Sequence, residues 1–413
     1  MKARIIAVAV LVAALAVAAS SATGATRHSQ ASLTVWLQVD AQSGWPAVVA
    51  AANSAFQAKH PGVDVKVQYQ TWGTHLGKFD ATLAGGNAPD VIEMGNTEMV
   101  KYMAAGAFQD ITSSKSAFDN SGNWLEGLAA SGRYNGKIYG VPYYAGSRVV
   151  TYRTDLFRQA GIRAAPKSLG EFTADARKLN TKFGKKGFSP VYVAGTDWYS
   201  AMGFVYDFGG KIATQISGKW KSALDSPKAI AGLTAYKNFF LAASRASKTG
   251  DEARPTPYSV YAEGLAGSMI GAGWFSCCVG DKYKTSTAQF VMPSHEAGKP
   301  MPGFLGGSDL AVPAGANKQL AVDWIAAFTS TSAEKALQAV GNIPNATSLL
   351  NTTKVNEKAA LRSWFVPAAK NWVNVENGNI LRTMLAQILT GKLSVKQAAA
   401  AASDNITYTL NAS

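Results

Sequence analysis

The sequence predicts an α/β protein of two lobes, each built on a central, mostly parallel sheet flanked by helices. Three observations predict this fold class. Short apolar strands alternate with helices in the first part of the chain, which is the pattern of a parallel sheet with covered faces. About 390 residues follow an apolar N-terminal segment, which is too many for one ordinary core. The chain starts one unit, builds a helix-rich second one and then returns to the first.

The first unit is predicted from its periodicity. Alternating apolar residues predict strands over residues 33–39 and 63–70, and a short apolar run predicts a third strand over 90–94. Helices are predicted between them, over residues 45–60, where a Pro-Gly pair follows, and over about 75–84. Strands that alternate with helices in this way favour parallel pairing.

The middle of the chain, from about residue 148 to 298, is richer in helix. Ser168 with Glu171 three residues later predicts a capping box at the start of a helix that ends at Phe183. Ser226 and Pro227 open another helix, which runs to about residue 244, because proline is tolerated in a first turn.

The return to the first unit begins with a strand-like segment over residues 304–313, followed by a helix over 319–329. From Glu357 to the end, the pattern is helical. We therefore expect interleaved lobes and no simple tandem arrangement.

The first residues have the pattern of a signal peptide. Lys2 and Arg4 precede an apolar run over residues 5–19, and small residues follow at once. This run is shorter than the roughly 18 to 20 residues of a membrane-spanning helix, so a retained anchor is the weaker alternative. We expect residues 1–24 to be removed. No cysteine lies near the cleavage site, so we expect a secreted protein, periplasmic or associated with the cell envelope, without a lipid anchor.

The formal net charge of +14 raises the question of a nucleic-acid partner. The lysines and arginines are scattered, however, and no nucleic-acid motif accompanies them. We expect no nucleic acid, and a solvated basic surface that keeps the protein near an anionic envelope.

The only two cysteines are the neighbours Cys277 and Cys278, which excludes metal sites of the CxxC kind. The four histidines show no metal-ligand spacing, and no nucleotide or phosphate loop is present, so we expect neither a metal nor a cofactor. The two cysteines form either a strained vicinal disulfide or two free thiols.

Several segments, in order and spacing, resemble the extracellular solute-binding proteins of carbohydrate ABC importers, the family that includes maltose-binding protein. The similarity covers the chain from Leu33 to Leu410 and is carried by the segments VWLQVD, FQAKHPGVDVKVQYQ, LAGGNAPDVIEMGNT, AAGAFQDIT, RYNGKIYGVPYYAGSRVVTYRTDLFRQAGI, GSMIGAGWFS, FLGGSDLAVPAGANKQLAVDWIAAFTS and LTGKLSVKQAAAAASDNI. The third segment is similar to members that carry amino sugars or chito-oligosaccharides.

The resemblance implies a periplasmic-binding-protein fold of type II, with a hinge between an N-terminal lobe (31–143 plus 308–345) and a C-terminal lobe (144–307 plus 346–413). It implies a monomer that binds a sugar or oligosaccharide between the lobes and delivers it to the permease of an ABC importer. It also implies no catalysis. The same fold with a polyol, glycerol phosphate or another small solute is the first alternative. A secreted glycosidase is a remote one, because no carboxylate pair stands out.

A sugar site needs aromatic platforms for the ring faces and planar polar groups for the hydroxyls. The resemblance places Trp274, in GAGWFS, as the stacking residue, and Asp40 as a partner of sugar hydroxyls. It further places the following residues at the site: Glu93, Asn96, Tyr143, Tyr144, Asp197, Trp198, Tyr199, Ser308, Asp309 and Arg382. Structural roles in caps, turns or the core remain open alternatives for all of these side chains.

The sequence also departs from the family at two stacking positions of maltose-binding protein. Its first-lobe tryptophan falls at Met94 here. Its second-lobe tryptophan falls at Gly378, so that platform is either missing or supplied by Trp372. These changes argue against maltodextrin as the ligand.

Overall fold

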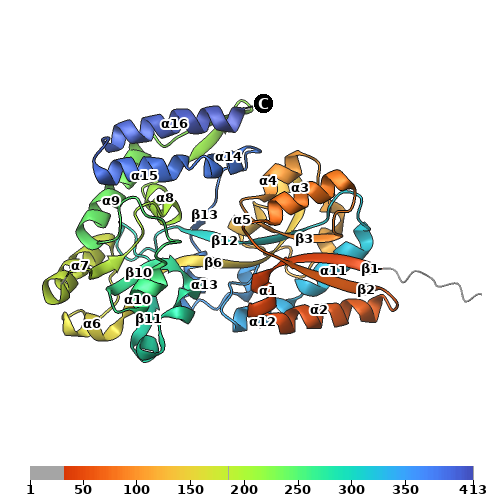
Figure 1. Ribbon diagram of the computed structural model, residues 1–413, viewed down its shortest axis with the longest axis horizontal. Helices are drawn as coiled ribbons and strands as arrows, with labels where there is room; N and C mark the ends of the chain where they lie inside the picture. Colours follow the sequence, from red (N-terminus) through yellow and green to blue (C-terminus); the bar gives the residue numbers. More distant parts are fainter. Residues whose placement is uncertain (1–31, 185, 413) are drawn as a thin grey trace, which may run out of the picture.

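The computed structural model of the protein describes residues 32–184 and 186–412. The predicted signal peptide, residues 1–24, lies outside these ranges. Two lobes lie side by side, and two long strands, β6 (Gly140–Arg153) and β12 (Gly303–Ala311), run between them (Figure 1). No helix in the described ranges is long and apolar enough to cross a membrane.

The main sheet has the strand order β2-β1-β3-β12-β6-β10-β7, with β11 added to β6 and β13 to β12. Pairing is parallel between β1 and β2, β1 and β3, and β7 and β10, whereas β6 and β12 run antiparallel to their neighbours in this order. The further strands are β1 (Ser32–Gln38), β2 (Asp64–Gln70), β3 (Val91–Gly95), β7 (Ser189–Tyr192), β10 (Ala266–Ala272), β11 (Thr287–Phe290) and β13 (Ser363–Trp364).

The first lobe packs helices against β1, β2 and β3. Leu33, Val35 and Leu37 alternate along β1 and pack with Val49 and Phe56 of α2 in one buried core. The helices of this lobe are α1 (Val39–Gly44), α2 (Pro46–Lys59), α3 (His75–Gly85), α4 (Met99–Ala104), α5 (Glu126–Ala129), α11 (Lys318–Phe328) and α12 (Thr331–Ala339), with the hairpin β4 (Arg133–Tyr134) and β5 (Lys137–Ile138).

The second lobe surrounds β7, β10 and β11. Trp198 packs against Phe304, Trp364 and Trp372, so aromatic residues from distant segments fill the space beside β12. Its helices are α6 (Thr154–Gln159), α7 (Leu169–Phe183), α8 (Trp198–Asp207), α9 (Pro227–Ala243), α10 (Pro257–Ala262), α13 (Val355–Ala360), α14 (Trp372–Asn377), α15 (Ile380–Thr390) and α16 (Val395–Asn411), with the hairpin β8 (Ala213–Ile216) and β9 (Lys219–Ser222).

The predicted strands and helices of the first unit are confirmed to within one or two residues, as are the helix opened by Ser226 and the strand of the return segment. The capping box at Ser168 is half formed. The Ser168 hydroxyl accepts a hydrogen bond from the Glu171 N–H, but the Glu171 carboxylate accepts one from the N–H of Lys167 instead of Ser168. A complete capping box occurs at Ser394, before α16.

The prediction of continuous helical character after Glu357 is wrong in part. Strand β13 and an irregular segment separate α13 from α14. The reason is tertiary: Phe304 on β12 pairs in parallel with Trp364, which recruits this short segment to the sheet.

Candidate functional site

A cavity of about 360 Å³ lies where β6 and β12 run between the lobes. Its floor is the β6 segment from Tyr144 to Arg148 together with Gly306 and Gly307 of β12. A Cβ atom at Gly307 would lie 2.0 Å from the carbonyl oxygen of Tyr144, so only glycine permits the two strands to approach here. The volume falls within the range of small-molecule sites.

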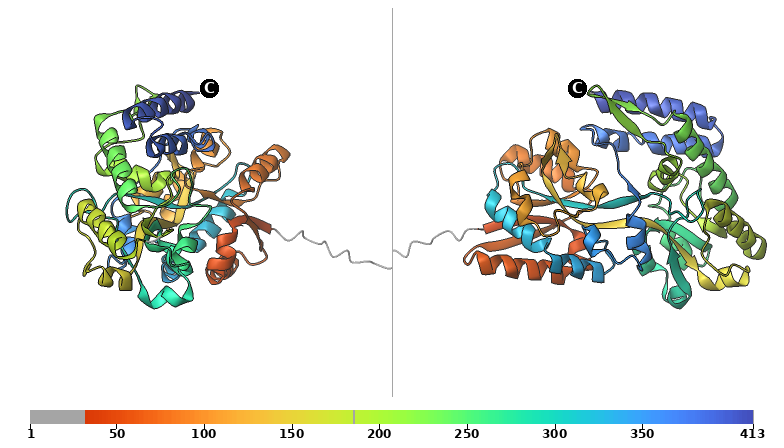
Figure 2. Two further views of the ribbon diagram at one scale, coloured as in Figure 1. Left: turned by 60° about the vertical axis from the view of Figure 1, so that its left-hand side comes forward. Right: turned by 180° about the vertical axis from the view of Figure 1, so that it is seen from behind.

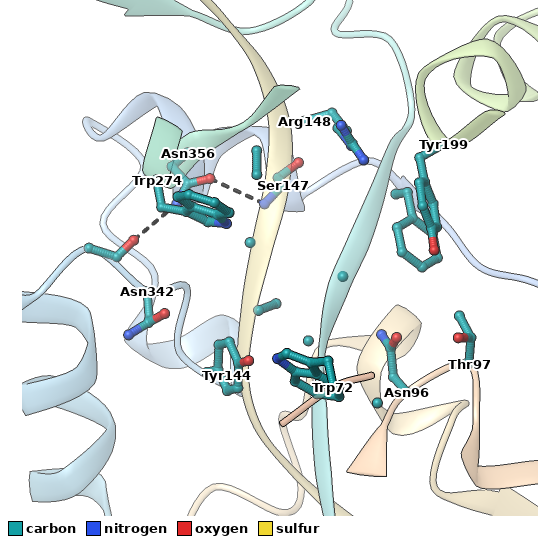
Figure 3. A pocket seen from close by; sticks show the side chains of 18 of the residues that line it. Trp72, Asn96, Thr97, Tyr144, Ser147, Arg148, Tyr199, Trp274, Asn342 and Asn356 are labelled. Carbon is teal, nitrogen blue, oxygen red and sulfur yellow. Dashed lines mark hydrogen bonds between the residues drawn. The ribbon is translucent and has the colours of Figure 1, made fainter. Parts of the chain in front are cut away.

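The walls of the cavity come from segments that are far apart in the sequence (Figure 3). Segments packed with the first lobe contribute Trp72, Asn96, Thr97, Glu98 and Asn342. Segments packed with the second lobe contribute the side chains of Tyr199, Trp274, Phe304, Asn356 and Glu376. A ligand in this cavity would therefore contact both lobes.

Two indole rings of the cavity wall are exposed. Trp274 is 54% exposed and Trp72 is 40% exposed, whereas Trp324 and Trp372 are fully buried. Trp274 follows β10 in a 3-10 turn, and a Cβ atom at the preceding Gly273 would lie 2.4 Å from the amide oxygen of Asn356. Glycine therefore lets this turn pack closely on α13 and presents the Trp274 ring to the cavity.

Trp72 was not among the residues predicted from the sequence. Its Nε1 donates a hydrogen bond to Asp40 Oδ2 over 2.6 Å, so Asp40 supports the platform and does not itself line the cavity. A signal was present in the sequence: Trp72 lies two residues after the end of the predicted strand 63–70, and α/β sheets place ligands at the carboxyl ends of strands.

His75 and Glu98 lie beneath the Trp72 platform. The buried imidazole contacts the Trp72 carbonyl oxygen through Nδ1 and Glu98 Oε2 through Nε2, both at 2.9 Å. Glu98 Oε2 also accepts a hydrogen bond from the Gly95 N–H at 2.9 Å. Burial lowers the pKa of His75, but its hydrogen bond to Glu98 and the charge of that carboxylate raise it more, so the net pKa is raised.

Arg148 is neutralised by its own neighbours. Its guanidinium makes two bonds to Glu252, of 2.5 and 2.7 Å, and lies 3.3 Å from Asp197 Oδ2. Asp197 also caps α8 by accepting hydrogen bonds from Ser200. Burial raises the pKa of Asp197, against the opposite effect of Arg148. The guanidinium therefore adds no net positive charge to the cavity.

The cavity wall also contains the carboxyl group of Glu376. Burial raises its pKa to about 7, while the indole N–H of Trp372 donates to it and lowers the pKa. A carboxyl group that titrates near neutral pH can accept a hydrogen bond from a hydroxyl in one form and donate one in the other.

Four of the predicted site residues line the cavity: Asn96, Tyr144, Tyr199 and Trp274. Trp198 is buried behind Tyr199 and stacks on it with ring centroids 4.0 Å apart. Together with Asp40 and Asp197, it supports residues that line the wall.

Four other predicted residues are buried away from the cavity surface. The Glu93 carboxylate accepts a hydrogen bond from the Gln38 N–H at 2.8 Å, and Asp309 accepts one from the Ser131 hydroxyl at 2.6 Å. Burial raises the pKa of both carboxyl groups to about 7. Tyr143 packs against Phe328 and Ser308 lies next to Tyr144, so these side chains belong to the support of the sheet.

The remaining predicted positions lie elsewhere. Arg382 pairs with Asp251 at 3.2 Å beside a separate hollow. Met94, Trp372 and Gly378 provide no exposed platform, since the first two are buried and Gly378 ends α14. The first-lobe platform is Trp72 instead.

The cysteine pair adjoins the Trp274 turn. Cys278 is exposed and is not a free thiol. The side chain of Cys277 lies outside the described part of the structure, so the vicinal disulfide stays a prediction. No group of three or more metal-ligating side chains occurs among the described residues.

Comparison with protein families gives one match over most of the chain. Residues 36–335 match the family described as bacterial extracellular solute-binding protein. The diacetylchitobiose binding protein DasA of Streptomyces coelicolor is 34% identical over 383 residues, which covers 89% of this chain and 88% of the relative.

Solved structures with a similar fold bind different ligands. The GacH receptor of Streptomyces glaucescens, solved unliganded and with acarbose, aligns with a TM-score of 0.76 at 21% identity, covering 92% of this chain and 98% of its own. UgpB of Mycobacterium tuberculosis, solved with glycerophosphocholine, aligns with a TM-score of 0.72 at 20% identity and covers the same shares. Likeness at this level shows the two-lobe fold.

Proposed function

Since the chain belongs to the bacterial extracellular solute-binding proteins, we propose that it is the sugar-binding component of an ABC importer. It takes a short oligosaccharide into the cavity between its lobes and delivers it to a membrane permease. It acts as a monomer, outside the cytoplasm, after removal of the signal peptide, and it catalyses no reaction.

The observation that carries this proposal is the pairing of exposed indole rings with planar polar groups around one cavity. Trp72 and Trp274 stand on different lobes, and the amides of Asn96, Asn342 and Asn356 lie among them. Ring faces of a sugar pack on indoles, and amides match hydroxyl groups in both donor and acceptor roles.

The charges of the site favour an uncharged ligand. Arg148 is engaged by Glu252 and Asp197, and the other acidic side chains of the cavity wall that can carry a charge near neutral pH are those of Glu98 and Glu376. A phosphate group would meet carboxylates here and no available cation. This argues for a sugar over glycerol phosphate, which is one of the alternative ligands with the same fold.

The relative from Streptomyces coelicolor is described as a diacetylchitobiose binding protein, and the similarity covers most of both chains. We therefore take a short oligosaccharide of N-acetylated amino sugars as the cargo. The acetamido group offers one donor and one acceptor, which suits the three asparagine amides of the wall.

Binding and delivery follow from the two-lobe arrangement. We take the lobes as residues 31–143 plus 308–345 and residues 144–307 plus 346–413. The two boundaries lie within or beside β6 and β12, which run between the two lobes in Figure 1. A ligand that touches both lobes stabilises the closed arrangement over the open one, and only this differential contact shifts the equilibrium.

Thermal unfolding in the presence of candidate ligands tests the proposal. Diacetylchitobiose is expected to raise the melting temperature, since a ligand at 100 times its Kd adds about 2.7 kcal/mol to stability. Maltose, glycerol 3-phosphate and glycerophosphocholine serve as comparisons. Stabilisation by the phosphate-bearing compounds alone would overturn the sugar assignment. Release of reducing ends from a bound oligosaccharide would overturn the assignment as a carrier.

A further inference from the structure

The two lobes differ strongly in charge. Residues 32–143 and 308–345 contain 9 lysines and arginines against 12 aspartates and glutamates. Residues 144–307 and 346–413 contain 28 against 14. The positive charge of the protein therefore belongs to the second lobe, while the first lobe is slightly acidic.

Part of this charge gathers at one end of the molecule. Residues 153–186, a range that includes α6, α7 and the loop between them, contain 9 basic and 3 acidic residues. Figures 1 and 2 place α6 and α7 at the end of the second lobe that lies farthest from the first. We define the α6–α7 surface by five exposed residues: Arg158, Arg163, Lys167, Arg177 and Lys182.

The charges of the α6–α7 surface are not neutralised locally. The three acidic residues of the segment have other partners than these five side chains: Asp155 pairs with Arg153, Asp175 with Lys178, and Glu171 accepts a hydrogen bond from the backbone N–H of Lys167. Among the described residues, no salt bridge joins any of the five side chains to a carboxylate. Helix α7 buries Phe172 and Leu179, which leaves its basic residues on the outer face.

Two hollows of about 450 and 480 Å³ flank the loop between α6 and α7. Arg158 and Arg163 line one of them, and Lys167 and Lys358 line the other with Lys299. No acidic side chain lines either hollow. Because the consecutive residues 164 and 165 line different hollows, the two lie on opposite sides of one loop.

We propose that the α6–α7 surface binds the headgroups of anionic phospholipids and holds the second lobe against the membrane in which the permease lies. The basic side chains are spread over two helices and a loop and do not converge on one point, so they suit a surface that carries many charges. The Debye length is about 8 Å at physiological ionic strength, so only charges on the contacting face contribute. Hollows lined by basic side chains allow phosphate groups to approach them.

Cosedimentation with vesicles tests this proposal. The full protein is mixed with phosphatidylcholine vesicles that do or do not contain phosphatidylglycerol. We expect binding only to the vesicles with phosphatidylglycerol, and a steep loss of binding as salt is raised. Absence of binding at low salt would overturn the proposal. Binding to soluble polyphosphate but not to these vesicles would overturn it as well, because the partner would then be a polymer.

A matched pair of triple variants locates the surface. Arg163→Gln, Arg177→Gln and Lys182→Gln together are expected to weaken vesicle binding at least about tenfold, because each change removes one positive charge from the contacting face. Lys59→Gln, Lys66→Gln and Lys335→Gln remove the same charge from exposed positions of the first lobe and are expected to change binding less than about twofold. Equal losses of vesicle binding in both variants would show that only the net charge of the protein matters. This result would overturn the assignment of membrane binding to the α6–α7 surface.

Sugar affinity, measured by calorimetry, is expected to be unchanged in both triple variants, because none of the six residues lines the cavity. The proposed sugar function and the membrane surface can therefore fail independently of each other.

Discussion

The imidazole of His75 meets the indole of Trp72 edge-on, with ring centroids 5.3 Å apart and an interplanar angle of 88°. His75 also contacts the Trp72 carbonyl oxygen and the Glu98 carboxylate through its two nitrogens. Because both partners are acceptors, both nitrogens donate only when the imidazole is protonated. The protonation of the buried His75 is thus linked to the position of the exposed Trp72 indole.

This linkage predicts that the contribution of His75 to the free energy of unfolding depends on pH. The folded-state pKa of His75 is raised above its ordinary value of 6.5. The contribution of protonated His75 to the free energy of unfolding is therefore complete below pH 6.5 and is lost as pH rises through the folded pKa. Urea unfolding at pH 6 and pH 9 should show that His75→Gln costs ~1 kcal/mol more at pH 6. A pH-independent cost would contradict protonation of His75.

The same linkage reaches the ligand. Sugar affinity of the unmodified protein should weaken between pH 6 and pH 9, and His75→Gln should reduce this pH dependence. The part that remains is expected from Glu376, which lines the cavity and whose pKa burial raises to about 7. His60→Gln is the control, since His60 pairs with Asp323 away from the cavity and should leave the profile unchanged.

Asp40 and Trp72 should act as a unit in ligand binding. Asp40→Ala and Trp72→Phe each remove the 2.6 Å hydrogen bond, and a bond of this kind contributes about 0.5–1.5 kcal/mol. Each change is expected to weaken sugar affinity about threefold or more, and Asp40→Asn less, because its amide oxygen still accepts. In a calorimetric double-mutant cycle the two losses should not add; full additivity would separate Asp40 from the platform.

Trp274 should contribute to affinity without contributing to stability. Since its ring is 54% exposed, Trp274→Ala is expected to lower sugar affinity at least about tenfold while changing unfolding free energy by less than ~0.5 kcal/mol. Trp274→Phe should recover part of the affinity. Tyr408→Ala, at an 80% exposed position on α16, is the control. Unchanged calorimetric affinity of Trp274→Ala would remove this residue from the site.

Arg148 should behave as part of the scaffold. Its removal leaves Glu252 and Asp197 close together with no cation between them, so Arg148→Ala is expected to cost ~3 kcal/mol of unfolding free energy. Arg177→Ala, on the outer face of α7, should cost less than ~0.5 kcal/mol. If Arg148→Ala unfolds at the same urea concentration as the unmodified protein, the neutralised guanidinium is not a structural element.

The sequence predicts some features of the site and not others. Periodicity located the strands and helices because each follows from local apolar spacing, and the order of motifs singled out Trp274, which lines the cavity. The sequence could not separate wall from support at β12, where a change of register between Ser308 and Asp309 leaves both side chains buried.

The sequence by itself determined the α/β elements, the return to the first lobe and the family resemblance, since these depend on local spacing and motif order. Only the tertiary structure decided that the Trp72 indole is exposed in the cavity wall, that Glu376 and Asn356 join the cavity, and that α6 and α7 lie at the far end of the second lobe. The physical reason is that the exposure of an indole and the neighbours of a charge depend on residues far away in the sequence, which only tertiary packing brings together.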